Sequence, residues 1–223
     1  MEQVNLDDKG IIEYGAAWEA QKELFGRLKT ERDSGGTLML CEHPNVYTLG
    51  LHGKSDNMLV DEGMLEKIGA SLWRTDRGGD ITFHGYGQLV AYPIFDLQRL
   101  GMGLRDYIYR LEEAVIATIA HWGIEGERSE GATGVWCRVG ASLDKICAIG
   151  VKASGFVTMH GLALNVGTDL KYFTYINPCG FTDRGVTSID KMCGKKVPMD
   201  DVKKCFVSHM ERIFGIEILS PVR

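Results

Sequence analysis

Residues 77–95 of the chain read RGGDITFHGYGQLVAYPIF. Two short apolar runs in this stretch, 81–83 and 89–95, are bounded by glycines, a pattern typical of β-strands. The glycine-rich connection between the two runs is too short to hold a crossover helix, which argues against parallel pairing of these strands. The stretch therefore predicts a mixed or largely antiparallel sheet and disfavours a doubly wound parallel one.

Similar apolar runs recur on both sides of this stretch. We expect further strands at 37–41, 46–51, 134–139, 146–151 and 162–166. Apolar positions at helical spacing predict three helices, and glycines follow the last two of them. These helices are expected at 14–29, 104–119 and 202–213. The predicted fold class is α+β, in mixed α/β layers, with helices packed on the sheet.

Composition and charge restrict the class of protein. The chain has 223 residues, of which 44% are hydrophobic and 25% are charged, and no repeat or linker divides it, so we expect one domain over residues 1–223. Its net charge of −5 argues against nucleic acid or an anionic membrane as a partner. Because the first residues are acidic and no apolar run is long enough to span a bilayer, the expected location is cytoplasmic.

The cysteines predict neither a disulfide framework nor a zinc site, because no two of them form a C-x-x-C pair. Cys179 lies between Pro178 and Gly180, which favours an accessible loop. From the residues alone, a reactive and an inert thiol are equally good interpretations of Cys179. The other five occur in or beside apolar segments and are expected to be buried: Cys41, Cys137, Cys147, Cys193 and Cys205.

Three other side chains are candidates for chemistry. His84 and His160 each precede a glycine at a strand end. Histidines in such places are more often hydrogen-bonded structural residues than catalysts. Lys145 opens an apolar strand, where burial would lower its pKa and suit it to acid or base chemistry, although a lysine that extends to water is the commoner case. Sequence spacing does not show whether any of the three meets Cys179.

Four motifs, in this order, resemble those of the lipoyl(octanoyl) transferases of lipoate biosynthesis. They are RGG-x-x-T-x-HG-x-GQLV-x-YPI from Arg77, KI-x-AIG from Lys145, HG-x-ALN from His160 and PCG from Pro178. Together with the segment from Glu42 to Gly50, the resemblance extends over about residues 36–190. It implies the fold of the biotin and lipoate protein ligases, a mixed sheet with helices on one side.

The resemblance also implies an activity and its partners. Members of the family move an octanoyl group from acyl carrier protein onto a lysine of lipoyl domains, here those of 2-oxoacid dehydrogenases and of the glycine cleavage H protein. No metal and no cofactor take part. Cys179 would carry the acyl group as a thioester, and Lys145 would lower the pKa of the thiol and handle the proton.

A substrate cleft follows from the same resemblance. Backbone N–H groups near Gly78 and Gly79, or at Gly161, would hold the oxyanion that develops during acyl transfer. The cleft residues are expected to be Arg77, Gly78, Gly79, Asp80, Ile81, Thr82, Phe83, His84, Ala148, Ile149, Gly150, His160, Gly161, Leu162 and Ala163.

Two positions depart from the family pattern. Tyr86 stands where proline is common, and Cys147 stands where a small residue such as alanine is usual. If Cys147 faced the cleft, it could form a disulfide with Cys179 under oxidation.

An acidic chain needs a local basic surface if it is to bind an acidic acyl carrier protein. We expect such a rim around the cleft, and scattered solvated charges are an equally good interpretation. The candidate residues are Arg74, Arg77, Arg138, Lys152, Lys171 and Arg184.

Other functions are compatible with parts of the pattern. The leading alternative is an ATP-dependent lipoate or biotin protein ligase of the same fold, which needs no nucleophilic cysteine. A protein that only binds acylated carriers or lipoyl domains is a second alternative. A papain-like hydrolase is disfavoured because Cys179 follows the candidate histidines. The presence of both Lys145 and Cys179 favours the transferase.

Overall fold

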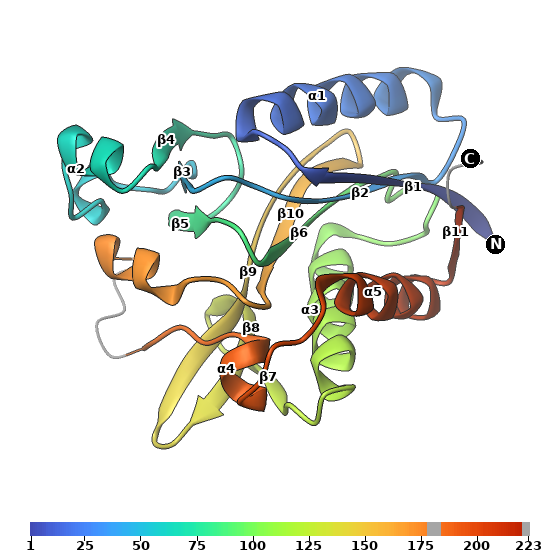
Figure 1. Ribbon diagram of the computed structural model, residues 1–223. Coiled ribbons are helices and arrows are strands. Elements are labelled where there is room, and N and C mark those ends of the chain that lie inside the picture. Colours follow the sequence, from blue (N-terminus) through green and yellow to red (C-terminus); the bar gives the residue numbers. More distant parts are fainter. Residues whose placement is uncertain (178–183, 220–223) are drawn as a thin grey trace.

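Two β-sheets organise the computed structural model, which describes residues 1–177 and 184–219 (Figure 1). Within these residues one sheet has eight strands in the order β11-β1-β2-β6-β10-β9-β8-β7, and the other has three in the order β4-β3-β5. The strands of the large sheet are β1 (Glu2–Ile11), β2 (Gly36–Glu42), β6 (Gln88–Phe95), β7 (Gly126–Ser129), β8 (Ala132–Val139), β9 (Ser142–Ser154), β10 (Val157–Asn165) and β11 (Ile216–Leu219). Those of the small sheet are β3 (Val46–Leu49), β4 (Ser71–Arg74) and β5 (Ile81–His84).

Strand pairing confirms the mixed sheet. β1 pairs in parallel with β2 and β11, so the start of the chain and its last described strand lie side by side. β2, β6, β10, β9, β8 and β7 pair antiparallel in that order. The α+β fold class is therefore confirmed, although β1 was not expected because its sequence EQVNLDDKGI is mostly polar.

The three predicted helices are present as α1 (Tyr14–Glu31), α3 (Leu104–Ala120) and α5 (Met199–Phe214). α1 and α5 end at residues in the left-handed region, Arg32 and Gly215. The shorter helical segments are η1 (Ser55–Asn57), α2 (Glu62–Lys67), η2 (Leu170–Tyr175) and α4 (Ile189–Cys193).

Helices cover both faces of the large sheet, so the expectation of helices on one side is wrong. α1 lies over one face, and α3 and α5 lie over the other (Figure 1). The reason is visible in β6, which is buried along its whole length. Successive side chains of a strand point to opposite faces. Leu89 accordingly packs in the core under α3 and α5, while Val90 packs in the core under α1.

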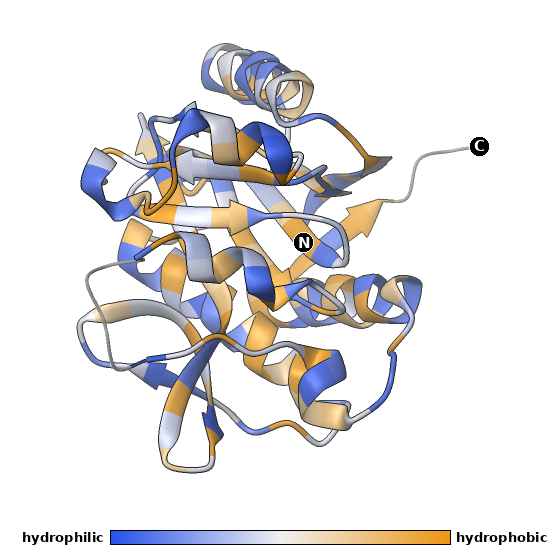
Figure 2. Cartoon of the chain, turned by 60° about the vertical axis from the view of Figure 1, so that its left-hand side comes forward, coloured by the Kyte–Doolittle hydropathy of each residue, from blue (hydrophilic) through white to orange (hydrophobic). Residues whose placement is uncertain are grey.

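The apolar bands of the helices in Figure 2 reflect the same two cores. Both faces of β2 also contribute to them, since Leu38 faces α3 and α5 and Met39 faces α1. Burial of apolar surface on both faces of the sheet is the main contribution that favours this layered fold.

The small sheet has its own core and places a loop beside the large sheet. Phe83 of β5 stacks on Tyr172 of η2, with ring centroids 4.7 Å apart and an interplanar angle of 4°. The loop that precedes β5 then reaches β9, where the Gly78 N–H donates to the Val151 carbonyl over 2.9 Å. This contact joins the loop to the large sheet.

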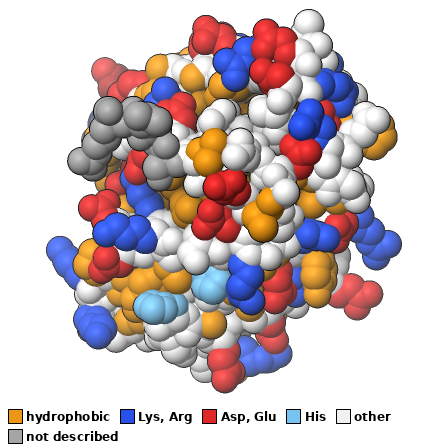
Figure 3. Space-filling view, turned by 90° about the vertical axis from the view of Figure 1, so that its right-hand side faces the viewer, with side chains coloured by type: hydrophobic (Ala, Val, Ile, Leu, Met, Phe, Trp, Pro, Cys, Tyr) orange, Lys and Arg blue, Asp and Glu red, His pale blue; other side chains and the backbone are white. Residues whose placement is uncertain are grey.

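Charged side chains are interspersed on the face shown in Figure 3, with acidic and basic groups beside one another. Ion pairs of the described residues include Arg99 with Glu2 at 2.9 Å and Lys203 with Asp8 at 2.8 Å. Among the helices of the described residues, none is both long and apolar enough to cross a membrane.

Candidate active site

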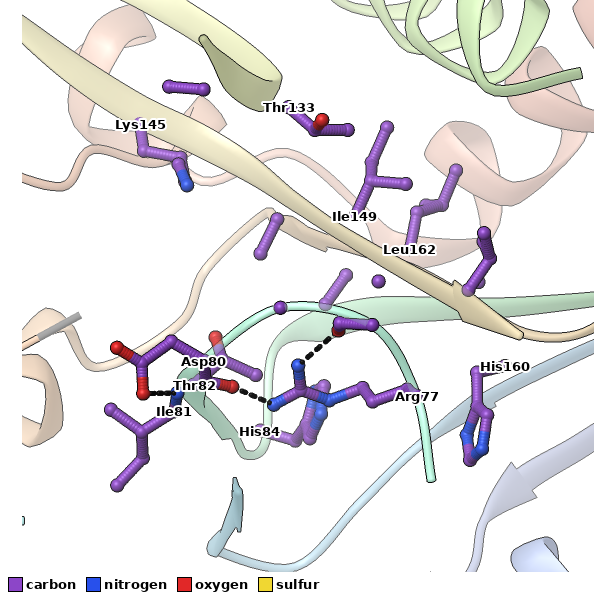
Figure 4. Close-up of a pocket in the computed structure, with 18 of the residues that line it drawn as sticks. Arg77, Asp80, Ile81, Thr82, His84, Thr133, Lys145, Ile149, His160 and Leu162 are labelled. Carbon is purple, nitrogen blue, oxygen red and sulfur yellow. Dashed lines mark hydrogen bonds between the residues drawn. The ribbon is translucent and has the colours of Figure 1, made fainter. Parts of the chain in front are cut away.

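A cavity of about 520 Å³ lies between the loop before β5 and strands β9 and β10. This volume is in the range of small-molecule sites. Figure 4 shows Lys145 and Thr133 on one side of the cavity and Arg77, Asp80 and His84 on the other. The residues of the expected cleft that line it are Arg77, Gly78, Gly79, Asp80, Ile81, Thr82, His84, Ala148, Ile149, Gly150, His160, Gly161, Leu162 and Ala163. Phe83 is the exception, because its ring points into the core of the small sheet.

Lys145 also lines the cavity, near the start of β9. Its Nζ lies 4.5 Å from the centroid of the Trp136 ring, and the guanidinium of Arg184 lies 5.0 Å from the centroid of the same ring. Cations are attracted to the face of an indole ring. Trp136 is 2% exposed, so this end of the cavity combines two positive charges with a buried aromatic surface.

Cys179 lies outside the described residues. The described stretch that follows it, Arg184 to Val186, lines the cavity. This stretch pairs with β9: the Lys145 N–H donates to the Gly185 carbonyl over 2.9 Å, and the Thr187 N–H donates to the Lys145 carbonyl over 3.0 Å. The described stretch that follows Cys179 is thus hydrogen-bonded to the backbone of Lys145.

Arg77 holds the loop together from inside. Its guanidinium donates to the carbonyls of Thr48, Gly78 and Asp80 over 2.6, 3.0 and 2.7 Å. The side chain is 8% exposed. Arg77 is therefore a buried structural cation, and its expected place in a basic rim is wrong.

Two other members of the expected rim have acidic partners. Lys152 Nζ lies 2.6 Å from Asp76, and Arg138 lies 3.1 Å from Glu127. Their positive charges are partly offset where they stand.

Glycine is required where backbones meet at the cavity wall. A Cβ atom on Gly150 would lie 2.7 Å from the Gly78 carbonyl oxygen and 3.2 Å from Arg77 Cδ. Gly79 has a φ of +88°, which disfavours any other residue there. The Gly78 N–H is used by Val151, so it is not available to an oxyanion. Of the two N–H groups expected to hold the oxyanion near this loop, that of Gly78 is excluded and that of Gly79 stays a prediction.

His160 is held in an unusual conformation by buried partners. Its φ is +59°, and its backbone N–H donates to Gln21 Oε1 over 2.9 Å. Its Nε2 lies 2.7 Å from Asp76 Oδ1, while Asp76 Oδ2 bonds Lys152. Burial lowers the pKa of His160 to about 4, although Asp76 opposes this shift.

His84 is a neutral group within a hydrogen-bonded cluster. Burial, with help from the charges of neighbouring groups, lowers its pKa to about 3. Its Nδ1 lies 2.9 Å from Gln88 Oε1, and its Nε2 lies 3.3 Å from Thr48 Oγ1.

Sequence reasoning missed the functional interest of Gln88 and Asn165, which both line the cavity. Both occur in the quoted motifs, in GQLV and ALN. A polar side chain that ends an otherwise apolar strand was the available signal.

The described cysteines lie away from the cavity lining. Cys147 is buried in the core under α3 and α5, and burial raises the pKa of its thiol well above the ordinary value. Its expected disulfide partner lies outside the described residues, but the condition for that bond, a position facing the cleft, is not met. Cys193 and Cys205 are only half-buried, so the expectation of burial is confirmed for Cys41, Cys137 and Cys147 alone.

Among the residues that the structure describes, the titratable groups form no metal centre. No group of three or more His, Cys, Asp or Glu side chains within residues 1–177 and 184–219 is arranged to hold a metal ion.

Comparison with protein families gives a match to the catalytic domain of lipoyl protein ligases A and B over residues 13–211. The chain is 52% identical to an octanoyltransferase of Bacteroides fragilis over 88% of its length and 91% of the relative's. It is 45% identical to an octanoyltransferase of Flavobacterium johnsoniae, covering 97% of this chain and 98% of that one.

Solved structures with the same fold are more distant in sequence. A bipartite lipoate protein ligase of Thermoplasma acidophilum superposes with a TM-score of 0.70 at 18% identity, covering 100% of this chain and 88% of that one. A biotin protein ligase of Aquifex aeolicus gives a TM-score of 0.51 at 13% identity, covering 95% of this chain and 69% of that one. These likenesses establish a shared fold.

Proposed function

The chain belongs to the family of lipoyl protein ligase A/B catalytic domains and is an octanoyltransferase, and we propose that it transfers the octanoyl group through a thioester on Cys179. The observation that carries the proposal is the place of Lys145. It lines the cavity, and its backbone pairs with the stretch that follows Cys179 by a few residues. In this proposal residues 1–223 act as one catalytic domain.

The first half-reaction moves the acyl group from octanoyl-acyl carrier protein to the enzyme. The Cys179 thiolate attacks the carbonyl carbon of the donor thioester, and the bond to the carrier's sulfur breaks. The Lys145 ammonium favours the thiolate before attack and then gives its proton to the departing carrier thiolate. Because one thioester replaces another, the acyl transfer itself is nearly isoenergetic.

The second half-reaction forms an amide on a lipoyl domain. The acceptor lysine amine attacks the enzyme thioester, the new C–N bond forms, and the Cys179 thiolate leaves. Lys145, neutral after the first step, takes the proton that the amine nitrogen loses. Both residues return to their starting state, and the products are an amide and a free carrier thiol.

The cavity suits an acyl chain along β9. Ile149 and Leu162 are paired across β9 and β10 and contribute apolar surface, whereas Lys145, near the start of β9, and Arg184 lie against the Trp136 ring. Apolar walls with a few placed polar groups are typical of such sites. We infer that the carbonyl lies near Lys145 and that the hydrocarbon extends toward Ile149.

Intact-mass spectrometry tests the proposal. The protein is mixed with octanoyl-acyl carrier protein, and a single octanoyl adduct, removed by neutral hydroxylamine, is expected on the native chain. The adduct should be absent from Cys179→Ala, slow to form in Lys145→Met, and unchanged in the matched control Cys193→Ala, whose half-buried thiol lies outside the cavity lining. An adduct that persists in Cys179→Ala places the nucleophile elsewhere.

A ligase reaction is the alternative to separate from this one. A lipoate-protein ligase A bound with ATP shares the fold, with a TM-score of 0.68 at 17% identity. The transferase requires no nucleotide, so free octanoate with ATP should give no modified acceptor. Modification of a lipoyl domain under those conditions, or a rise in melting temperature on adding ATP, supports the ligase instead.

The lipoyl domain is the acceptor class that the family suggests. The Thermoplasma acidophilum ligase has been described together with its E2 lipoyl domain. We propose lipoyl domains of 2-oxoacid dehydrogenases and the glycine cleavage H protein as acceptors. Transfer from the isolated octanoyl-enzyme to each purified domain, followed by mass spectrometry, measures this directly.

A further inference from the structure

We propose that Asn165 is a positioning residue for acyl transfer, which fixes the stretch after Cys179 against the backbone of Lys145 at one end of a buried hydrogen-bond relay. The proposal rests on the function proposed above, because Asn165 would position Lys145 and Cys179, the two residues that carry out the proposed transfer. Asn165 is the last residue of β10 and is 4% exposed.

Both ends of the Asn165 side chain are occupied. Its Nδ2 donates to the Thr187 carbonyl over 3.0 Å, and its Oδ1 accepts from Gln88 Nε2 over 2.9 Å. Because a backbone carbonyl can only accept, the bond to Thr187 fixes which end of the amide is nitrogen. Gln88 is fixed in the same way, since its Nε2 also donates to the Phe83 carbonyl over 3.1 Å.

The relay continues from Gln88 to the glycine loop. With its Nε2 used as a donor, Gln88 offers Oε1 to His84, so the neutral His84 ring carries its hydrogen on Nδ1. His84 Nε2 must then accept, and it receives the Thr48 hydroxyl hydrogen over 3.3 Å. Thr48 Oγ1 in turn accepts from Arg77 Nη2 over 2.9 Å.

Every hydrogen bond of this relay therefore runs in one direction. Arg77 donates to Thr48, Thr48 to His84, His84 to Gln88, Gln88 to Asn165, and Asn165 to the Thr187 carbonyl. All of these residues are buried. Buried polar chains of this kind are rigid when each member is satisfied, and reversing one member disturbs the next.

The last link reaches the catalytic lysine. Thr187 receives the Asn165 bond on its carbonyl and gives its N–H to the Lys145 carbonyl, while the Lys145 N–H donates to Gly185. Gly185 itself lies against Asp144, where a Cβ atom would approach the carboxylate oxygen to 2.7 Å. Asn165 thus fixes the described stretch after Cys179 against β9, next to Lys145.

Asn165→Asp is the sharpest test, because it keeps the shape of the side chain and replaces the donor to Thr187 with an acceptor. We expect kcat for octanoyl transfer to fall roughly ten- to hundredfold with little change in KM for octanoyl-acyl carrier protein, as for a displaced reacting group. In the proposed function the Lys145 ammonium stabilises the Cys179 thiolate, so its displacement should raise the midpoint of the pH dependence of Cys179 alkylation by iodoacetamide by about one pH unit.

Asn45→Asp is the matched control. Asn45 Nδ2 donates to the Tyr172 hydroxyl over 2.8 Å, and this hydroxyl donates to the Ile68 carbonyl over 3.2 Å. In the variant the hydroxyl can turn and donate to the new carboxylate in place of Ile68, at a small cost in stability away from the cavity lining. This variant should keep the native kcat and the native alkylation profile.

Gln88→Glu provides a second, independent reversal within the relay. The new carboxylate oxygen faces Asn165 Oδ1, and turning the Asn165 amide to relieve this would place its oxygen against the Thr187 carbonyl. The same losses are expected, so the proposal stays testable if Asn165→Asp does not fold.

The outcomes separate the two proposals. A folded Asn165→Asp or Gln88→Glu with native kcat and a native alkylation profile, even at a lower melting temperature, overturns the positioning role. Persistence of the acyl adduct in Cys179→Ala overturns the proposed function instead and is read from a different sample.

Discussion

Asp76 links His160 to Lys152, with Oδ1 2.7 Å from His160 Nε2 and Oδ2 2.6 Å from Lys152 Nζ. Burial raises the pKa of Asp76, but the hydrogen bonds from Lys152 and His160 outweigh it and the net shift is downward. The carboxylate is therefore charged at neutral pH, whereas His160 is neutral with a pKa lowered to about 4. The contact is a hydrogen bond from an imidazole, and the ion pair is with Lys152.

Buried neutral histidines make the fold sensitive to acid. Burial lowers the pKa of His43 to about 4, as it does for His160, and that of His84 to about 3. Because the unfolded chain binds protons on histidine near pH 6.5, it holds more protons than the folded chain between about pH 6.5 and 4. The contribution of these histidines to the free energy of unfolding is expected to be at its maximum above pH 6.5. It should decrease as the pH falls from about 6.5 to 4.

Urea unfolding at a series of pH values measures this effect. His43→Gln should remove up to about 1.4 kcal/mol per pH unit from the slope in the window, because one titrating group is lost. His52→Gln, at an exposed position, should leave the slope unchanged. Equal slopes for native protein and His43→Gln contradict the assignment of a neutral buried His43.

The loop over β9 should not tolerate a side chain at Gly150. Gly150→Ala places a methyl group 2.7 Å from the Gly78 carbonyl oxygen, so the loop must move and the Gly78–Val151 hydrogen bond must lengthen. We expect a loss of about 1–3 kcal/mol of stability and slower acylation of Cys179. Stopped acylation assays with mass detection, together with thermal melts, give both values.

Gly26→Ala is the control for that substitution. Gly26 lies within α1, and no atom lies within 4 Å of the position its Cβ would take. Alanine should raise stability there by about 0.5–1 kcal/mol and leave acylation native. Native acylation in Gly150→Ala would show that the loop is not part of the reactive cavity.

Several elements could be predicted from sequence because a period or a glycine marked them. The helices at α1, α3 and α5 follow from apolar positions at helical spacing, and β6 follows from its continuous apolar run. β1 and β11 were missed. Both lie at the parallel edge of the sheet, and β1 has mostly polar side chains, so its pairing is decided by distant backbone partners that no local pattern reveals.

The site residues also divide into features that the sequence predicts and features that depend on partners distant in the chain. The cleft motifs from Arg77, Lys145 and His160 converge on one cavity, and their role in binding substrate stays a prediction. The inward direction of Arg77 could not be predicted, because it depends on carbonyls of Thr48 and Asp80 that meet only after folding. The relay through Asn165 was missed for the same reason, since its partners are far apart in the chain.

The burial of Cys147 predicts a thiol that does not react in the folded state. The side chain is 0% exposed, and burial strongly raises the pKa of its thiol. Iodoacetamide should label Cys147 only after unfolding, as read by peptide mass mapping with and without urea. Labelling of Cys147 in the native protein at the rate of Cys193 would contradict its place in the core.

Replacing Arg77 by lysine should be costly even though the charge is kept. The guanidinium spans three carbonyls and the Thr48 hydroxyl, and an ammonium cannot reach them together. We expect Arg77→Lys to lose about 3 kcal/mol or more of stability, as for a buried charge deprived of partners. Chemical denaturation is the measurement, and Arg27→Lys on the exposed face of α1 should change little.

Ile149 is expected to limit the length of the acyl chain. From Lys145 to Ile149 the strand advances four residues, about 13 Å at the usual rise per residue, which suits a medium-length chain lying along β9. Ile149→Phe adds bulk to the cavity wall four residues along β9 from Lys145 and should lower kcat/KM for octanoyl more than for hexanoyl, by roughly tenfold or more. The ratio of kcat/KM for hexanoyl- and octanoyl-acyl carrier protein measures this preference.

Ile213→Phe, on α5 and away from the cavity lining, should keep the native ratio. Because a general loss of stability would lower both rates together, an unchanged ratio in Ile149→Phe would mean that the hydrocarbon does not extend toward Ile149.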